Sequence, residues 1–169
     1  MLIAIIADSH DNVANLKRAL EWMRLNKVET ILHCGDIVHL AMLAQAWPPD
    51  FRARIECVAG NADFVGEFER APQVLKDKLT YHGEVGGLET EGIKIAFCHT
   101  PARAKKLAAD EKYQMIFYGH THKPWIEKIG ATYLINPGNL AGQRTEATLA
   151  LYDSVEKRLD LKKLVDLIV

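Results

Sequence analysis

Short apolar runs alternate with segments of helical periodicity in the first third of the chain. The run LIAIIA at 2–7 is apolar at every position, which is typical of a strand buried on both faces. Asp11 or Asn12 can cap the helix that follows, where apolar residues recur every three or four positions. The alternation predicts strands at 2–7, 30–34 and 54–59, and a short helix at 38–47 that ends at Pro48-Pro49.

The later part of the chain has the pattern of hairpins around one more helix. Residues 64–78 are charged and irregular, with a break at Pro72, and are expected to form a loop with one helical turn. Gly92 marks the turn between GLETEG and IKIAFC, and Thr100-Pro101 begins a helix at 101–112. Further strands are predicted at 114–118, 125–129 and 132–135, followed by an antiparallel hairpin of TLALYD and RLDLK.

Strands that alternate with helices and then give way to hairpins predict an α/β fold with a mixed sheet or two packed sheets. No internal repeat, low-complexity segment or linker interrupts the pattern. The chain has 169 residues, which suits one domain, and we expect that domain to span residues 1–169.

Composition and charge narrow the class of protein. The 21 Lys and Arg residues nearly balance the 22 Asp and Glu residues, so the net charge of −1 gives no general attraction to nucleic acid or to an anionic membrane. The apolar opening has no basic flank and soon meets Asp8, which favours a strand over a signal peptide or membrane span. Cys34, Cys57 and Cys98 lie in or at the end of apolar runs, which favours buried thiols in a reducing compartment, the cytoplasm.

Polar motifs follow five of the apolar runs directly. These motifs are DSHD, GD, GN, HT and GHTH. In open α/β sheets, ligands bind beyond the carboxyl ends of the strands. We therefore expect the strand ends to bring one set of side chains to a single edge: Asp8, His10, Asp36, Asn61, His99, His120 and His122.

These residue types are those of a metal site. Four imidazoles, two carboxylates and an amide oxygen suit a borderline divalent ion such as Mn, Fe, Zn, Ni or Co. Seven ligands are too many for one such ion and suit two ions about 3.5–4 Å apart that share a carboxylate. The pairs Asp8-x-His10 and His120-x-His122 have the spacing at which side chains of an extended segment face the same way. Glycines precede three of the ligands and are expected to let the backbone turn tightly there: Gly35, Gly60 and Gly119.

Each of these residues also has an ordinary structural explanation. Asp8 alone suits a helix cap, and Gly60-Asn61 alone suits a turn. Five such coincidences at the same end of five strands are less plausible than one metal site, so we favour the site.

Residues outside this set keep more ordinary interpretations. His33 lies inside a strand and is expected to be a satisfied core histidine, while His39, just past Asp36, suits either a substrate contact or the surface. His82 is assigned to a loop. Trp22 and Trp47 are assigned to the core, and Trp125 to the core or a pocket wall.

In their order and spacing the five motifs resemble those of the calcineurin-like metallophosphoesterase superfamily. The resemblance covers residues 8–122 and is closest to the small single-domain phosphodiesterases of the YfcE type, which share NPG at 136–138. It implies a four-layer fold with two mixed β-sheets packed between helices. It also implies a ligand assignment, with Asp8, His10 and His122 on one metal, Asn61, His99 and His120 on the other, and Asp36 bridging.

The sequence departs from that family at two positions near the site. Larger members follow GN with a histidine that assists the leaving group, whereas this chain has Ala62, followed by Asp63. The small branch usually has serine after NPG, where this chain has Asn139. Arg144 could still offer a guanidinium to the substrate.

Together these features predict a divalent-metal-dependent phosphoesterase, a phosphodiesterase by preference, with two ions, Mn first among the candidates. Water shared by the two metals would attack phosphorus, its pKa lowered to roughly 7. Asp36, Asn61, His99 and His120 would serve catalysis as metal ligands, and His39 and Arg144 would bind substrate. The expected partner is a small phosphoester, not a membrane or nucleic acid, and a homo-oligomer is left open.

Two other functions remain open at this point. One is a non-catalytic interaction scaffold of the same fold, as in the small retromer subunit, which has a degraded metal site. The other is a metal-dependent hydrolase of a different bond, such as C–N.

Overall fold

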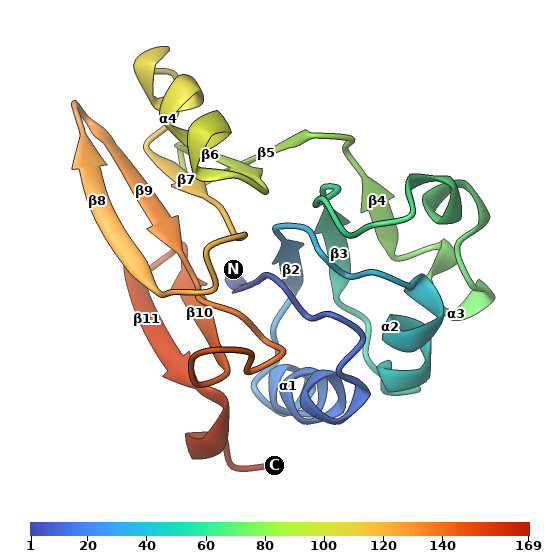
Figure 1. The fold of residues 1–169 in the computed structure, drawn as a ribbon. Coiled ribbons are helices and arrows are strands. Elements are labelled where there is room, and N and C mark those ends of the chain that lie inside the picture. The colour runs from blue at the N-terminus through green and yellow to red at the C-terminus, as the bar shows by residue number, and fades with distance from the viewer.

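The structure is a computed structural model that describes all 169 residues. Two β-sheets lie face to face, and helices cover their outer faces (Figure 1). The first sheet has the strand order β11 (Arg158–Lys163), β10 (Thr148–Asp153), β1 (Leu2–Ile6), β2 (Thr30–His33), β3 (Arg54–Cys57), β4 (Leu79–Tyr81). The second has the order β5 (Val85–Thr90), β6 (Ile93–Cys98), β7 (Met115–Phe117), β9 (Thr132–Asn136), β8 (Trp125–Ile129).

Both sheets are mixed, and each has a parallel centre. Strands β1 to β4 are parallel, while β10 and β11 add an antiparallel edge. Strands β6, β7 and β9 are parallel, while β5 and β8 pair antiparallel at the two edges. Since ligand sites lie beyond the carboxyl ends of parallel strands, the two parallel centres are where a site is expected.

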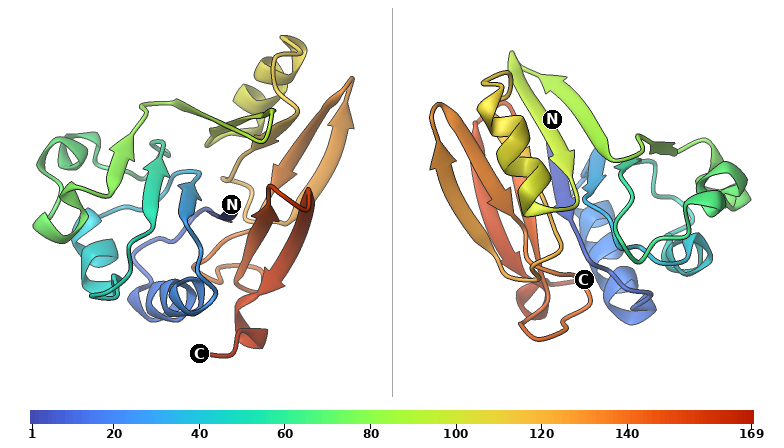
Figure 2. Two further views of the ribbon diagram at one scale, coloured as in Figure 1. Left: turned by 180° about the vertical axis from the view of Figure 1, so that it is seen from behind. Right: turned by 45° about the horizontal axis from the view of Figure 1, so that its top comes forward.

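Three apolar clusters separate the layers. Helices α1 (Val13–Leu25) and α2 (Leu40–Ala46) pack on the first sheet through a cluster that includes Leu20, Leu43 and Ile31. Residues such as Ile5 and Phe97 fill the space between the sheets. Helix α4 (Pro101–Ala109) covers the outer face of the second sheet. The order is helices, sheet, sheet, helix, as the two further views show (Figure 2), so the predicted four-layer fold is confirmed.

Most predicted elements are present, with boundaries shifted by a few residues. Asn12 caps α1, since its side chain accepts a hydrogen bond from the Asn15 N–H. Of the two predicted N-cap residues, Asn12 is therefore confirmed and Asp11 is not the cap. Helix α4 begins at Pro101 behind the Thr100 cap. The turn of the first hairpin lies at Gly92, which has φ of +72°.

The segment after β3 has more regular structure than its charge pattern predicts. It contains a 3-10 helix, η1 (Val65–Arg70), and a short helix, α3 (Gln73–Lys76). Strand β4 follows and was not predicted, because three residues give too short a run to show a period. A second 3-10 helix, η2 (Leu164–Asp166), follows β11.

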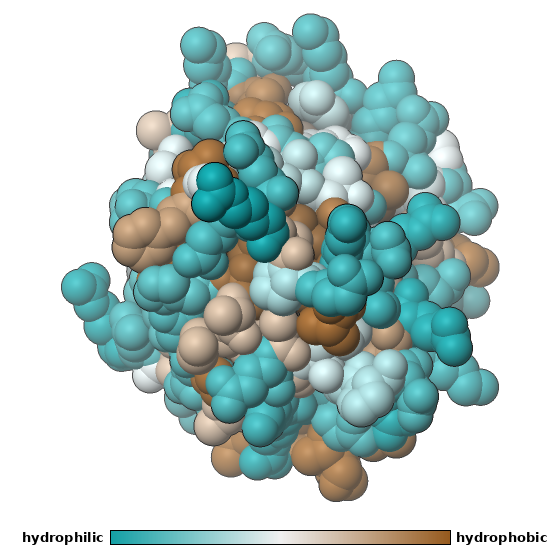
Figure 3. Space-filling model, turned by 90° about the vertical axis from the view of Figure 1, so that its right-hand side faces the viewer, coloured by the Kyte–Doolittle hydropathy of each residue, from teal (hydrophilic) through white to brown (hydrophobic).

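The outer surface beside α2 and α3 is mainly hydrophilic, with scattered apolar spots (Figure 3). No helix of the protein combines the length and the apolar character needed to span a membrane. The three cysteines are buried and free, as predicted.

Candidate metal centre

The segments after β1, β2, β3, β6 and β7 meet between the two sheets. All seven side chains that the strand-end rule selected lie there, in two groups joined by a carboxylate. Asp8, Asp36 and His99 are buried, while Asn61 and His120 are exposed. The cluster therefore opens to solvent on the side of Asn61 and His120.

The first group consists of Asp8, His10 and His122. Asp8 Oδ1 lies 3.3 Å from His122 Nε2 and 3.9 Å from His10 Nε2. The two imidazole Nε2 atoms face each other at 3.3 Å. Three ligand atoms thus surround one point, as a metal ion requires.

The second group consists of Asn61, His99 and His120. Asn61 Oδ1 lies 2.8 Å from His120 Nδ1 and 3.1 Å from His99 Nε2. The two ring nitrogens are 3.2 Å apart. An amide oxygen and two imidazoles again converge on one point.

Asp36 lies between the two groups. Its Oδ2 atom is 3.6 Å from His10 Nε2 and 3.4 Å from His99 Nε2, so one oxygen faces both groups. Its Oδ1 atom accepts a hydrogen bond of 2.8 Å from the Ala62 N–H, which fixes the orientation of the carboxylate.

The protonation of His99 tests whether this arrangement fits a cation. His99 Nδ1 is 2.8 Å from the Cys34 carbonyl oxygen, which can only accept, so Nδ1 carries the proton. A neutral His99 then turns the lone pair of Nε2 toward Asn61 Oδ1, which is itself an acceptor. A cation between the two would satisfy both, and a backbone carbonyl that holds the far nitrogen is the usual partner of a metal-binding imidazole. The donor set therefore fits a divalent ion.

Electrostatics at the buried end of the cluster also favour positive charge. Burial raises the pKa of Asp8 to about 7, and the neighbouring Asp36 carboxylate adds to this, although His99 opposes it. Burial opposes the ionisation of Asp36 too, but the adjacent His99 and a hydrogen bond from the Ala62 N–H outweigh it and lower the pKa. Burial disfavours a charged His99, yet Asp36 outweighs that effect and raises the pKa. A buried carboxylate pair costs free energy unless a cation compensates it.

The backbone at the ligands is not extended, which corrects the expectation from the D-x-H and H-x-H spacing. Asp8, His10, Asp36, His120 and His122 have φ between +41° and +68°. In the left-handed region side chains do not alternate, so His120 joins one group and His122 the other. Such backbone is uncommon away from glycine and concentrates at functional sites.

The glycines next to the ligands serve two purposes, of which only one was predicted. Gly35 has φ of +92° and makes the expected turn. Gly60 and Gly119 do not have positive φ, but a Cβ on Gly60 would overlap Asp36, and one on Gly119 would overlap Asp8 and Ala7. Space beside the two carboxylates, not a turn, requires glycine at these two positions.

Asp63 supports the site, a role that sequence reasoning did not assign to it. Its Oδ2 accepts hydrogen bonds from the N–H groups of Asp36 and Gly60 at 2.9 and 2.7 Å, and its Oδ1 accepts one of 2.7 Å from Val38. It ties the loop after β3 to the loop that carries Asp36. Its position two residues after Asn61 was the available signal.

Asn139 supports the other side of the cluster. Its amide nitrogen donates to the His122 carbonyl at 3.1 Å and to Thr145 Oγ1 at 2.8 Å, and Thr145 Oγ1 also donates to the His122 carbonyl. Its carbonyl oxygen accepts from the Gln143 N–H. Asn139 therefore anchors the loop that carries His122.

No hydrogen bond or ion pair joins either of the two predicted substrate contacts, His39 and Arg144, to one of the seven ligands. His39 Nδ1 is 2.6 Å from Asp11 Oδ2. Arg144 is exposed. Burial and the charge of His10 lower the pKa of His122, and the charge of Arg144 adds to that effect.

The remaining singled-out residues have structural positions. His33 is buried, as predicted. Its Nε2 atom lies 3.0 Å from Ser9 Oγ, but Nδ1 has no hydrogen-bond partner, so only one of the two ring nitrogens is satisfied. His82 lies in a loop, paired with Glu56. Trp22 and Trp47 are in the core, whereas Trp125 is 53% exposed and lines an apolar hollow.

Comparisons with known proteins identify the family of this chain. The family model of the calcineurin-like phosphoesterase superfamily domain matches residues 1–157. The phosphodiesterase MJ0936 of Methanocaldococcus jannaschii is 30% identical over 162 residues, 93% of this chain and 95% of that protein.

Solved structures show the same fold. A novel archaeal phosphodiesterase superposes with a TM-score of 0.80 at 27% identity, over 96% of this chain and 99% of that one. The phosphoesterase YfcE from E. coli superposes with a TM-score of 0.65 at 16% identity, over 97% and 100% of the two chains, a likeness of fold alone. With the family model covering nearly the whole sequence and a relative of 30% identity spanning it, the chain belongs to the calcineurin-like phosphoesterase superfamily.

Proposed function

We propose that the protein is a divalent-metal-dependent phosphodiesterase with a dinuclear centre. The observation that carries the proposal is the position of Asp36 Oδ2, which faces an imidazole of each group. Similarity to MJ0936, a protein named as a phosphodiesterase, supports diesters over monoesters.

In this proposal each side chain has a defined task. Asp8, His10 and His122 would hold one ion, Asn61, His99 and His120 the other, and Asp36 would contact both. When bound, two such ions lower the pKa of water and neutralise charge on phosphate oxygens. We propose Mn first, since the carboxylate and amide oxygens suit it, with Fe, Zn, Ni and Co, which imidazole ligands favour, as alternatives.

The protein itself contributes orientation and a route of entry. Hydrogen bonds from Ala62 to Asp36, and from His120 to Asp8 at 2.9 Å, hold the two carboxylates in place. The exposed Asn61 and His120 mark the side from which a phosphate group would approach. Arg144 would bind a phosphate oxygen, a role supported by the effect of its charge on the pKa of His122.

The test is hydrolysis of bis-p-nitrophenyl phosphate with Mn²⁺ added. Asp36→Asn keeps the size of the side chain but removes the charge that both groups face, so we expect the rate to fall roughly 100-fold or more. The bound metal, measured by elemental analysis, should fall as well. Asp110→Asn is the matched control, because Asp110 is exposed at the end of α4 and should leave both quantities unchanged. Equal rates for wild type and Asp36→Asn would refute the proposal.

The scaffold alternative is not favoured by any feature of the cluster. A scaffold has no physical reason to keep four imidazoles and two carboxylates converging at strained backbone positions. It would be supported by a protein that carries no metal after purification at neutral pH and hydrolyses neither mono- nor diesters. A screen of phosphodiesters, cyclic nucleotides and monoesters also tests the C–N alternative, since activity on phosphorus excludes it as the main reaction.

A further inference from the structure

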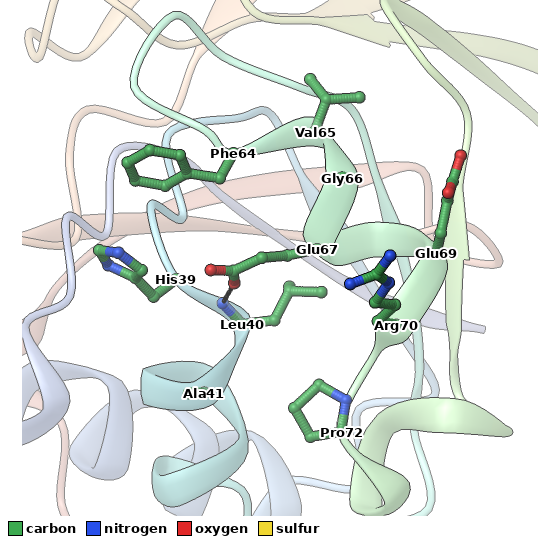
Figure 4. A pocket seen from close by; sticks show the side chains of 10 residues that line it. All are labelled: His39, Leu40, Ala41, Phe64, Val65, Gly66, Glu67, Glu69, Arg70 and Pro72. Atoms are coloured by element: carbon green, nitrogen blue, oxygen red, sulfur yellow. Dashed lines mark hydrogen bonds between the residues drawn. The ribbon is translucent and has the colours of Figure 1, made fainter.

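A pocket of about 830 Å³ lies between the start of α2 and the segment 64–72. Figure 4 shows the rings of His39 and Phe64 along one side of it, with Glu67 beside them. The ring centroids of His39 and Phe64 are 5.0 Å apart, and Phe64 is 57% exposed. A large exposed aromatic ring at the mouth of a pocket is a surface on which a planar ligand group can stack.

This pocket adjoins the metal centre through the backbone. Asp11 directly follows His10, and His39 comes three residues after Asp36. Phe64 follows Asp63, which binds the backbone of Asp36 and Val38. Both sides of the pocket are therefore extensions of loops that carry ligands.

His39, which lines this pocket, is paired with Asp11. Asp11 Oδ2 lies 2.6 Å from His39 Nδ1, and Asp11 Oδ1 accepts a hydrogen bond of 3.0 Å from the His39 N–H. The carboxylate holds the ring in one orientation and keeps the proton on Nδ1, which leaves Nε2 for another partner. His39 precedes α2 without a side-chain cap bond, so helix capping does not explain it.

We propose that this pocket receives the leaving group of the diester, that Phe64 stacks on a planar ring of that group, and that His39 Nε2 protonates the departing oxygen. The proposal rests on the proposed phosphodiesterase activity and deepens it. It supplies the acid that the ligand cluster lacks, since all four of its imidazoles are assigned to metal. The position after Asn61 is Ala62, whose methyl group cannot donate a proton.

The step balances as follows. Water forms a new bond to phosphorus and releases one proton to solvent, while the bond from phosphorus to the leaving oxygen breaks and its electron pair stays on that oxygen. The proton on His39 Nε2 transfers to the oxygen, which gives a neutral alcohol. Neutral His39 then takes a proton from solvent, and the net reaction is diester plus water to monoester plus alcohol.

The surroundings of His39 suit this role. Its hydrogen bond to Asp11 raises the pKa of the imidazole against the opposing effect of burial, and the charges of Asp11 and Glu67 add to the rise. Glu67 is fixed by a hydrogen bond of 2.8 Å from the Leu40 N–H. Positioned acids of this kind contribute roughly 100-fold or more when the leaving group is basic.

The first test compares two esters of similar shape, bis-p-nitrophenyl phosphate and diphenyl phosphate. Nitrophenolate leaves without a proton far more readily than phenolate does. We expect His39→Gln to lower the rate on diphenyl phosphate about 100-fold more than on the nitrophenyl ester, and to remove the fall in wild-type rate at high pH. His82→Gln, another histidine paired with a carboxylate, should leave the ratio of the two rates unchanged.

The second test is equilibrium binding of thymidine, a nucleoside product alcohol, to the metal-free protein by NMR. We expect shifts of the His39 and Phe64 ring signals, lost in Phe64→Leu, which keeps the apolar bulk but not the ring. If His39→Gln slows hydrolysis of both esters equally, the role of His39 as the acid is overturned while the proposed function stands. No hydrolysis by wild type would overturn the proposed function itself. No thymidine binding in wild type would overturn the stacking surface.

Discussion

Asp63→Asn should weaken metal binding, although the Asp63 side chain contacts only backbone atoms of the loops that carry the metal ligands. The carboxylate accepts three backbone hydrogen bonds, from Asp36, Gly60 and Val38. An amide can turn only one oxygen to these donors. If that oxygen faces Asp36 and Gly60, the new NH₂ group faces the Val38 N–H, and the charge is lost from all three bonds.

The magnitude follows from these contacts. A hydrogen bond to a charged group contributes about 1.5–3 kcal/mol, so the loss of one bond and the weakening of two should destabilise the protein by about 3 kcal/mol. Because the Asp36 N–H is one of the donors, Asp36 should lose its fixed position. Residues that orient metal ligands typically change affinity by about 10–100-fold, and we expect a fall in Mn²⁺ affinity in that range.

The assay separates the two effects. Isothermal titration calorimetry gives the Mn²⁺ affinity, and urea denaturation of metal-free protein gives the free energy of unfolding. Asp153→Asn is the matched control, because Asp153 Oδ1 accepts two backbone hydrogen bonds, from Val155 and Glu156, in the turn between β10 and β11. The control should lose stability without losing metal affinity. Wild-type affinity in Asp63→Asn would refute the argument that this residue positions Asp36.

Three further predictions concern the space beside Asp8, the protonation of His33 and the pH dependence of metal binding. In Gly119→Ala the added Cβ would overlap Asp8, so Mn²⁺ binding measured by calorimetry should be abolished while the circular dichroism spectrum stays that of wild type. Mn²⁺ binding by this variant would contradict the prediction. Burial lowers the pKa of His33 from 6.5 to about 4, so its unfolded form binds a proton first as the pH falls. Metal-free wild type should therefore lose about 3 kcal/mol of stability relative to His33→Gln between pH 6.5 and 4, and parallel urea denaturation curves for the two proteins would refute it. Since the raised pKa of Asp8 is about 7, Mn²⁺ affinity should fall about tenfold per pH unit below 7, and a flat profile from 7 to 5.5 would show that Asp8 does not bind metal.

The strands were predictable because each is an apolar run that the core requires. LIAIIA lies against the helices on one face and against the second sheet on the other, so neither face admits a polar residue. Strand β4 lacks such a run, since Leu79 and Tyr81 are half-buried and Thr80 is exposed at the sheet edge. Its pairing with β3 is decided by the neighbouring strand, and a local pattern cannot reveal that.

Convergence of the seven site residues followed from one topological rule, but their geometry did not. The rule states where strands end, and five strand ends meet at the centre of the two sheets. What it omits is the left-handed backbone at five of the seven residues, each at a cost of about 1–3 kcal/mol. Distant partners hold that backbone: the Asp8 N–H donates to Gly35, the His10 N–H donates to the Asp36 carbonyl, and Asp63 binds the Asp36 N–H. Each partner follows a different strand from the ligand that it holds, so the strained conformation of that ligand exists only when the other loop is in place. No window of sequence around a single motif contains the cause.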